Sequence, residues 1–474
     1  MVKERCIAMQ LSKDTLQRRL SGLTPVQFYL ILTAFCAFLG IAFGPFGSYA
    51  FEEMMVVPCV LFLGAMFPRQ ISSGAKRALR LSGLMLAWFA FLQIKRRLEY
   101  LEFYPFSPYF CAYLFAFPLA ALLQDGEKKA GLKLFFTALV AASVSHAVTA
   151  VLLLLDLVPA SLTEYHVFWD GSRLNSFWHP NMVACFLMFG IAACLAFLHS
   201  AKSKWAKLAM LAVILLLLST MALTNCRTVI ILTGGILGGS AFYSILRGRW
   251  KLAPIALVVA CVILVLVYKG CGKLYEIHTD ALTARQITEY LESEGLTLED
   301  LEAMSEDFTL ETTSAQKSLV EDLSSLNSRT VIWQSSFLAL NANRANYLFG
   351  VENPGKHMSY FCYFSQTHTH NSWVETLLGL GVPGFVLAMV FTLLTLWNGI
   401  VILLKYPLDV WKRTTAMVTL CMLVASFMEP YLFLPPLDYY IYNFIFLLCA
   451  GYLVHWQEED NRNMLTAVRK RLHI

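Results

Sequence analysis

The sequence has little charge for its length. Only 15% of its 474 residues are Asp, Glu, Lys or Arg, while 57% are apolar; a soluble domain carries roughly 25% charged residues. This balance excludes a soluble enzyme and a disordered chain. The net charge of +5 is small, so no nucleic-acid partner is predicted.

Several chemical signatures are also missing. The twelve cysteines form no CxxC pair and lie mostly within apolar runs, which excludes a disulfide scaffold and favours roles in apolar packing. There is no GxxxxGKS or GxxxxGKT phosphate loop, no GxSxG nucleophile motif and no HExxH zinc motif. No cofactor and no metal site are predicted.

The sequence does contain many long apolar runs. A helix that spans a bilayer needs ~20 mostly apolar residues. Twelve runs meet or approach this length, so the sequence predicts an all-α integral membrane protein with about twelve transmembrane helices. The runs lie near 26–46, 54–68, 80–94, 106–123, 133–155, 182–199, 206–224, 229–246, 252–268, 374–403, 414–428 and 439–456.

One boundary follows from length alone. Residues 208–246 contain a single charged residue, Arg227, and are nearly twice as long as one span. The chain must therefore turn near Thr224 to Arg227, which places Arg227 at a membrane face.

Lys and Arg in the loops predict the orientation. With a cytoplasmic N-terminus, 25 of the 37 basic residues fall on the cytoplasmic side. Both termini are then inside, and one large outer loop joins the ninth and tenth helices. Lys95, Arg96 and Arg97 violate this bias: either a neighbouring span is misread, or they serve an anionic ligand outside. The predicted segments are 1–25 (cytoplasmic), 26–268 (helices one to nine), 270–372 (outer loop), 373–456 (helices ten to twelve) and 457–474 (cytoplasmic tail).

The long loop has two unlike halves. Residues 281–326 are acidic with helical spacing, which is typical of a solvated helical cap. The second half holds clustered polar and aromatic residues and leads directly into an apolar span. Polar chemistry beside a membrane helix indicates an active site at the outer interface.

Three arginines and one histidine fall on this outer face: Arg173, Arg227, Arg329 and His370. An arginine fork binds phosphate oxygens bidentately and keeps its charge, so the arginines suit a lipid-linked phosphate. Pairing with lipid headgroups or loop carboxylates is the plainer alternative. A neutral imidazole ahead of a helix can act as a base at neutral pH, although His370 could simply bond the backbone.

The carboxylates of the predicted outer face are weaker candidates for site residues. Glu375 lies five residues after His370, and on a continuous helix it would point well away from it. Glu52 and Glu53 lie in the first outer loop and are the candidates for a metal-dependent alternative.

The motifs resemble those of the O-antigen ligase and polymerase family of bacterial membrane proteins. The most specific of these motifs is the one that begins at His370. The matching pieces are Arg173 with His179-Pro180-Asn181; Thr224-Asn225-Cys226-Arg227-Thr228; Ser328-Arg329-Thr330-Val331-Ile332-Trp333 with Leu348-Phe349-Gly350; and His370-Asn371-Ser372-Trp373 followed by Gly379-Leu380-Gly381-Val382-Pro383-Gly384.

This resemblance implies a membrane glycosyltransferase that moves a glycan from a polyprenyl (undecaprenyl) diphosphate carrier to a glycan or glycolipid acceptor. The enzyme would lie in the bacterial inner (plasma) membrane, with its site on the extracytoplasmic face. If the roles of the family's motif residues apply to the matching positions here, Arg227 and Arg329 would hold the diphosphate. His370 would be the base of an inverting, metal-independent transfer. The predicted substrate-binding residues are Arg173, Asn181, Asn371 and Trp333.

Three other functions are weighed against this one. A polysaccharide flippase would place charges at the bilayer midplane, a metal-dependent glycosyltransferase would use Glu52 or Glu53, and a receptor would use the acidic loop to bind a partner. The sequence does not choose between ligase and polymerase.

Overall fold

The structure is a computed structural model, and it describes residues 24–42, 73–100, 116–159, 166–170, 172–175, 180–246, 249–294, 329–351, 368–433 and 440–454. These segments form helices and one short antiparallel hairpin, in which Trp169 of β1 (Phe168–Asp170) faces Leu174 of β2 (Arg173–Asn175). The helices are Pro25–Ala42, α3 (Ser73–Tyr100), α5 (Phe117–Leu122), α6 (Asp125–Leu154), α8 (Pro180–Ser200), α9 (Lys204–Leu223), α10 (Arg227–Leu246), η2 (Trp250–Leu252), α11 (Ala253–Glu294), α14 (Arg329–Asn341), α15 (Arg344–Phe349), α17 (Ser372–Lys405), α18 (Val410–Ala425) and α19 (Tyr440–Leu453).

Eight of the described helices are long and apolar enough to cross a membrane, which confirms the all-α membrane fold. The helix α19 is shorter but also apolar over Ile441–Leu453, whereas α18 carries Lys412 and Arg413 in its first turn. The predicted run at 54–68 lies outside the described residues, and only the end of the run at 106–123 is described, as α5. The count of twelve spans therefore stays a prediction.

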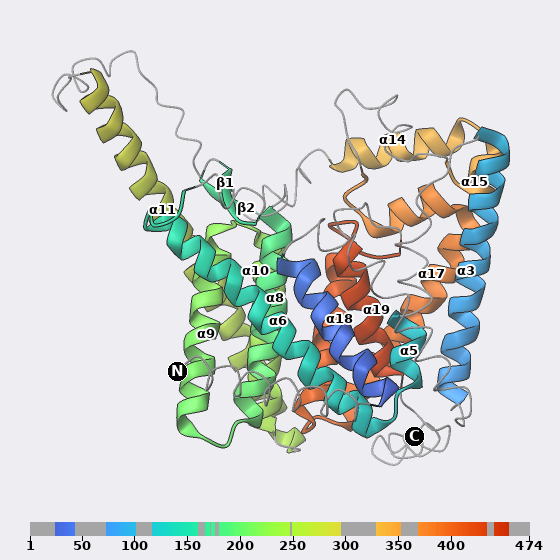
Figure 1. Ribbon diagram of the computed structural model, residues 1–474, viewed down its shortest axis with the longest axis horizontal. Helices are drawn as coiled ribbons and strands as arrows, with labels where there is room; N and C mark the ends of the chain where they lie inside the picture. Colours follow the sequence, from blue (N-terminus) through green and yellow to red (C-terminus); the bar gives the residue numbers. More distant parts are fainter. Residues whose placement is uncertain are drawn as a thin grey trace, which may run out of the picture.

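The predicted turn between two spans is present, because α9 ends at Leu223 and α10 begins at Arg227. The following helix, α11, does not stop where the ninth span was predicted to end. It runs unbroken for 42 residues, about 63 Å at 1.5 Å per residue. A hydrocarbon core of ~30 Å covers only half of that length, and the end of α11 projects beyond the other helices at the upper left of Figure 1.

The helix α8 forms the centre of the bundle. Its most apolar window is 83% buried, whereas that of α11 is only 11% buried. Because α8 carries no Asp, Glu, Lys or Arg, it can be enclosed by other helices without a desolvation penalty. The apolar side chains of α11 face outward instead, as expected for a helix that contacts lipid.

Small residues set how closely α10 and α11 approach. A Cβ added to Gly238 would lie 2.6 Å from the carbonyl oxygen of Ala260, and one added to Gly234 would lie 3.2 Å from the Cα of Leu264. Because only glycine leaves this space, the two backbones pack directly against each other, as in other membrane helix pairs.

The helix α17 is broken at Gly381, where φ is +67°. The break frees helix carbonyls that must be satisfied in a membrane. Leu378 O accepts from the backbone N–H of Val351 at 2.7 Å, and Leu380 O accepts from the indole N–H of Trp88 at 2.8 Å. A Cβ at Gly381 would clash with the carbonyl of Leu348, so glycine is required there for both space and backbone conformation.

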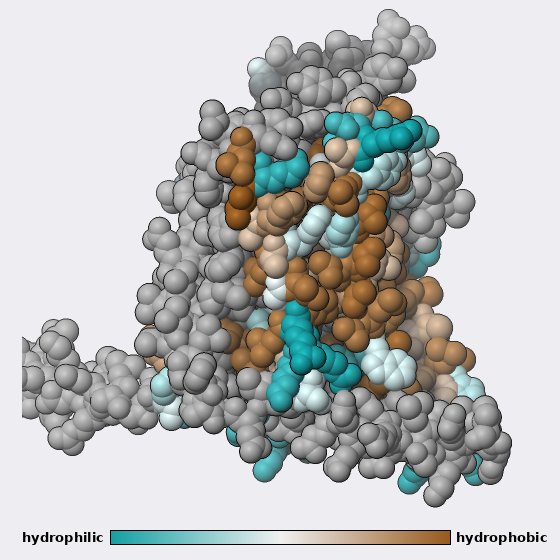
Figure 2. Space-filling view, turned by 90° about the vertical axis from the view of Figure 1, so that its right-hand side faces the viewer, coloured by the Kyte–Doolittle hydropathy of each residue, from teal (hydrophilic) through white to brown (hydrophobic). Residues whose placement is uncertain are grey.

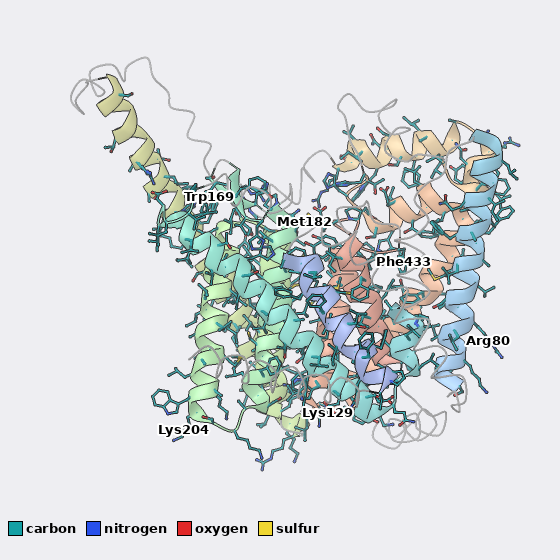
Figure 3. All side chains as sticks on the ribbon, viewed as in Figure 1. Arg80, Lys129, Trp169, Met182, Lys204 and Phe433 are labelled. Atoms are coloured by element: carbon teal, nitrogen blue, oxygen red, sulfur yellow. The ribbon has the colours of Figure 1, made fainter. Side chains whose placement is uncertain are left out.

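The labelled basic residues lie toward one end of the bundle. Arg80, Lys129 and Lys204 lie at the lower end of Figure 3, whereas Trp169 and Met182 lie at the upper end. Between these ends, Figure 2 shows hydrophobic side chains gathered in a band with hydrophilic side chains above and below it. On this side α3 exposes the large apolar side chains Leu84, Phe91 and Ile94. This pattern fits a bilayer, and the basic lower end fits the predicted cytoplasmic face.

Candidate active site

A carboxylate that the sequence analysis did not select lies at the centre of the candidate site. Glu429 follows α18 in an irregular segment that is fixed to the start of α17. Ser372 links the two segments: its N–H donates to Ser426 O at 2.8 Å, and its hydroxyl donates to Glu429 O at 2.9 Å. Asn371 adds a bond from its amide to Phe427 O at 3.0 Å. These bonds fix the backbone around Glu429 to the start of α17, and the Glu429 side chain is buried.

Three predicted site residues meet at the Glu429 carboxylate. Asn181 Nδ2 donates to Oε1 at 2.8 Å, and Arg329 Nη2 donates to the same oxygen at 3.0 Å. His370 Nδ1 lies 3.3 Å from Oε2. A buried carboxylate is costly unless it is paired and hydrogen-bonded, and these contacts from three separate segments satisfy that condition.

The His370 ring has a defined orientation. An ionised carboxylate only accepts hydrogen bonds, so Glu429 favours the proton on Nδ1 and leaves Nε2 as the basic nitrogen. Within the described part of the chain, Nε2 has no hydrogen-bond partner. His370 is followed by Asn371, whose side-chain oxygen caps α17 by accepting from the N–H groups of Trp373 and Val374.

The expectation that Glu375 points away from His370 is wrong. It assumed one continuous helix, but α17 begins at Ser372, and His370 lies before it in a left-handed conformation with φ +51°. The Glu375 side chain turns back, and its carboxylate accepts from the backbone N–H of Thr369 at 2.8 Å. Glu375 therefore supports the turn that carries His370.

The remaining arginines lie at the adjoining turn between α9 and α10. Arg173 Nε donates to Thr224 O at 3.1 Å, and Asn225 has a positive φ of +49° that reverses the chain before Arg227. Cys226, next to Arg227, is close enough to Arg173, Arg329 and Glu429 for electrostatic interaction. The three arginine-bearing segments thus converge on one region at the end of the bundle where α8 begins.

The hairpin that carries Arg173 is supported by α11. Ser172 Oγ and Tyr275 Oη lie 2.7 Å apart, and the Trp169 ring stacks on His278 with centroids 4.8 Å apart. Both partners lie on the part of α11 that continues past the predicted span. The extension of α11 therefore has a local structural role beside the site.

The predicted residues fall into three groups by geometry. Asn181, Arg329 and His370 are joined directly through Glu429, and Arg173 and Arg227 lie at the neighbouring turn. Trp333 and Asn371 make bonds within the protein: the Trp333 indole N–H donates to Thr369 O at 3.0 Å, and Asn371 caps α17. The catalytic and substrate-binding roles of all seven residues stay predictions.

Sequence reasoning missed Glu429, although one signal was available. It is the only charged residue between Arg413 and Asp438. A lone carboxylate within an apolar stretch of a membrane protein marks a functional candidate by default.

Of the three basic residues Lys95, Arg96 and Arg97 in α3, the structure describes the side chain of Lys95. Lys95 Nζ lies 4.8 Å from the centroid of the Phe349 ring, at the end of α15. Lys95 therefore lies at the same end of the bundle as α14 and α15 (Figure 1). The side chains of Arg96 and Arg97 lie outside the described residues.

Among the described residues, no three or more His, Cys, Asp or Glu side chains are grouped to hold a metal ion. Glu52 and Glu53 lie outside the described residues. Metal independence therefore stays a prediction.

Residues 211–389 match the family model described as O-antigen ligase. This segment contains Arg227, Arg329 and His370. No curated protein matches the sequence.

Proposed function

We propose that this chain is a member of the O-antigen ligase family, whose model matches residues 211–389, and that it transfers a glycan from a polyprenyl diphosphate carrier to a glycan or glycolipid acceptor. The family supports a glycosyltransferase-like role in polysaccharide assembly at a bacterial membrane. The observation that carries the finer proposal is the meeting of Arg329, Asn181 and His370 at the buried carboxylate of Glu429.

The arginines bind the diphosphate in this proposal. Arg329 uses Nη2 for Glu429, and its guanidinium has further N–H groups to offer to phosphate oxygens. Arg173 and Arg227 extend the cationic surface along the neighbouring turn. In a site beside the bilayer these fixed charges stabilise the departing diphosphate, and one such contact is typically worth about 10²–10³ in rate.

His370 acts as the general base. Its Nε2 accepts the proton of an acceptor hydroxyl while that oxygen attacks the anomeric carbon of the donor sugar. The bond between the anomeric carbon and the phosphate oxygen breaks, and its electron pair leaves with the diphosphate. Glu429 stabilises the imidazolium that forms, because the carboxylate faces Nδ1 at 3.3 Å. Attack opposite to the leaving group inverts the anomeric configuration.

The bilayer determines where the reaction takes place. The polyprenyl tail lies in the hydrocarbon region, and its diphosphate lies at the extracytoplasmic interface of the inner (plasma) membrane. This placement is supported by the position of the site at the end opposite to Arg80, Lys129 and Lys204 (Figure 3). A transporter would instead place its charged residues near the midplane.

The test uses the full-length protein purified in detergent with a fluorescent polyprenyl diphosphate-linked glycan and an acceptor. The expected result is transfer of the glycan with release of polyprenyl diphosphate in equal amount. Arg329→Ala should lose the reaction, whereas Arg344→Ala, at an exposed arginine in α15, should keep it. A wild-type protein that binds the donor but releases no polyprenyl diphosphate would refute the proposal.

The same donor chemistry serves a ligase and a polymerase. Deletion of the gene followed by sizing of the surface glycan separates them. Long chains that remain on the carrier indicate a ligase, and single repeats on the carrier indicate a polymerase.

A further inference from the structure

We infer that Glu375 is a positioning residue for the transfer reaction, because it fixes the turn that aims His370 at Glu429. The inference rests on the proposed function, in which His370 is the base. Glu375 does not touch the reacting atoms. It acts through Thr369, the residue before His370.

The burial of Glu375 needs an explanation. Its carboxylate is enclosed in the first turn of α17 and accepts from Thr369 N at 2.8 Å. Burial of a carboxylate carries a desolvation cost, so the burial of Glu375 is not explained by a gain in stability alone. Capping does not explain it, since Asn371 already accepts from the N–H groups of Trp373 and Val374.

Thr369 is held at every polar atom. Its N–H donates to Glu375, its hydroxyl donates to Asn371 O at 2.8 Å, and its carbonyl accepts from the Trp333 indole at 3.0 Å. The side chain is fully buried. The three polar groups of this buried residue are therefore fixed by three different residues, Glu375, Asn371 and Trp333.

The fixation matters because the next residue is strained. His370 has φ +51°, a left-handed conformation that is uncommon for residues with a Cβ and is held in place by its surroundings. In this conformation Nδ1 lies 3.3 Å from Glu429, which is already a long contact. A small rotation of the turn would break it and misdirect Nε2.

Two elements fix Thr369, the residue before His370. Glu375 holds Thr369 from α17, and Trp333 holds it from α14, one helical turn after Arg329. Arg329 and Trp333 share a face of α14, because residues four apart are neighbours on a helix. The turn that carries the base is therefore aligned with the helix that carries a predicted diphosphate ligand.

The predicted consequence is a selective loss of kcat. Glu375→Ala frees the Thr369 N–H and lets His370 relax, whereas the arginines that bind the donor are unchanged. Misplacement of a catalytic group by about 1 Å can cost about 10²-fold. The kcat should fall by about that factor, with KM and equilibrium binding of the fluorescent donor unchanged.

Conservative variants separate positioning from bulk stability. Glu375→Gln keeps a carbonyl oxygen that accepts from Thr369 N–H, so it should retain most of the kcat. Trp333→Phe removes the indole N–H that bonds Thr369 O, together with part of the ring, and should lower kcat through the same residue. The matched control is Thr376→Val, since the Thr376 hydroxyl is buried in the same turn and bonds only within its helix, to Ser372 O.

The assay is glycan transfer by full-length protein in detergent, with elution profile and thermal midpoint as checks of folding. A kcat for Glu375→Ala equal to that of Thr376→Val would overturn the inference, as would a Glu375→Gln variant as slow as Glu375→Ala. If Glu375→Ala does not fold, an unchanged kcat in Trp333→Phe overturns it.

The result also distinguishes this inference from the proposed function. An active wild type, an inactive His370→Ala and an unimpaired Glu375→Ala would overturn only the role of Glu375. A wild type that neither binds the polyprenyl diphosphate donor nor transfers its glycan would overturn the proposed function itself.

Discussion

Replacement of Glu429 by glutamine should slow glycan transfer by two to four orders of magnitude without unfolding the protein. The amide is nearly isosteric, so the bonds from Asn181 and Arg329 at 2.8 and 3.0 Å keep an oxygen acceptor. His370 loses its anionic partner. An amide N–H facing Nδ1 would select the tautomer with the proton on Nε2, which cannot act as a base, and such a tautomer change typically costs up to about 10⁴ in rate.

Removal of the side chain should have a different effect. Glu429→Ala leaves Arg329 and His370, whose side chains are only 18% and 20% exposed, without their carboxylate. Breaking a buried pair costs about 3–5 kcal/mol, and the partial exposure of both partners places this case at or below the lower end of that range. Glu429→Ala should therefore lower both the thermal midpoint and the transfer rate.

The assay compares glycan transfer and thermal midpoints of the Gln and Ala variants with Glu276→Gln as the control. Glu276 is an exposed carboxylate of α11 that pairs with Lys273. A Glu429→Gln variant with the wild-type rate and wild-type midpoint would show that the carboxylate charge does not serve His370.

Four further outcomes are expected. Arg227→Ala, Arg329→Ala and His370→Ala should each abolish transfer while the protein still inserts into the membrane. Replacement of either arginine by lysine should also abolish transfer, because a point charge lacks the bidentate fork. Near-normal activity of any one variant would show that the replaced residue does not have its proposed role. Transfer should persist in excess EDTA, and activity that vanishes and returns with Mg²⁺ or Mn²⁺ would reject the arginine mechanism. A cysteine in place of Asp300 should be labelled by an impermeant reagent in intact cells, because the loop 270–372 is predicted to lie outside. Labelling only after lysis would contradict the predicted topology. Gly381→Ala should lower the thermal midpoint by an amount worth about 1–3 kcal/mol, because alanine is strained at φ +67° and its Cβ meets Leu348; an unchanged midpoint would mean that the break in α17 is dispensable.

The parts of the fold that depend on local composition could be predicted from the sequence. Charge-poor runs indicated the long helices, and the length of residues 208–246 located the turn before Arg227. The break in α17 was not predicted, although its glycine and proline residues were noted as a motif. Its stability depends on Trp88, which lies 292 positions from its hydrogen-bond partner Leu380, and no local pattern reports such a bond.

The two carboxylates of the site were missed or misjudged for different physical reasons. Glu375 was misjudged because a helical projection was applied to His370, which lies outside the helix. Glu429 was missed because its partners His370, Arg329 and Asn181 lie 59, 100 and 248 positions away. Charge pairs at such separations are set by helix packing, which the sequence does not display.

The segment that matches the family model does not build the site alone. Residues 211–389 supply Arg227, Arg329 and His370, but Glu429 comes after this segment and Asn181 and Arg173 come before it. Without Glu429, Arg329 would have no buried counter-charge, and the imidazolium that His370 forms during transfer would be repelled by the neighbouring guanidinium. The carboxylate permits a guanidinium and an imidazole to share one site. A chain with the matching segment but no acid at the position of Glu429 would therefore need another anion there to keep Arg329 and His370 together.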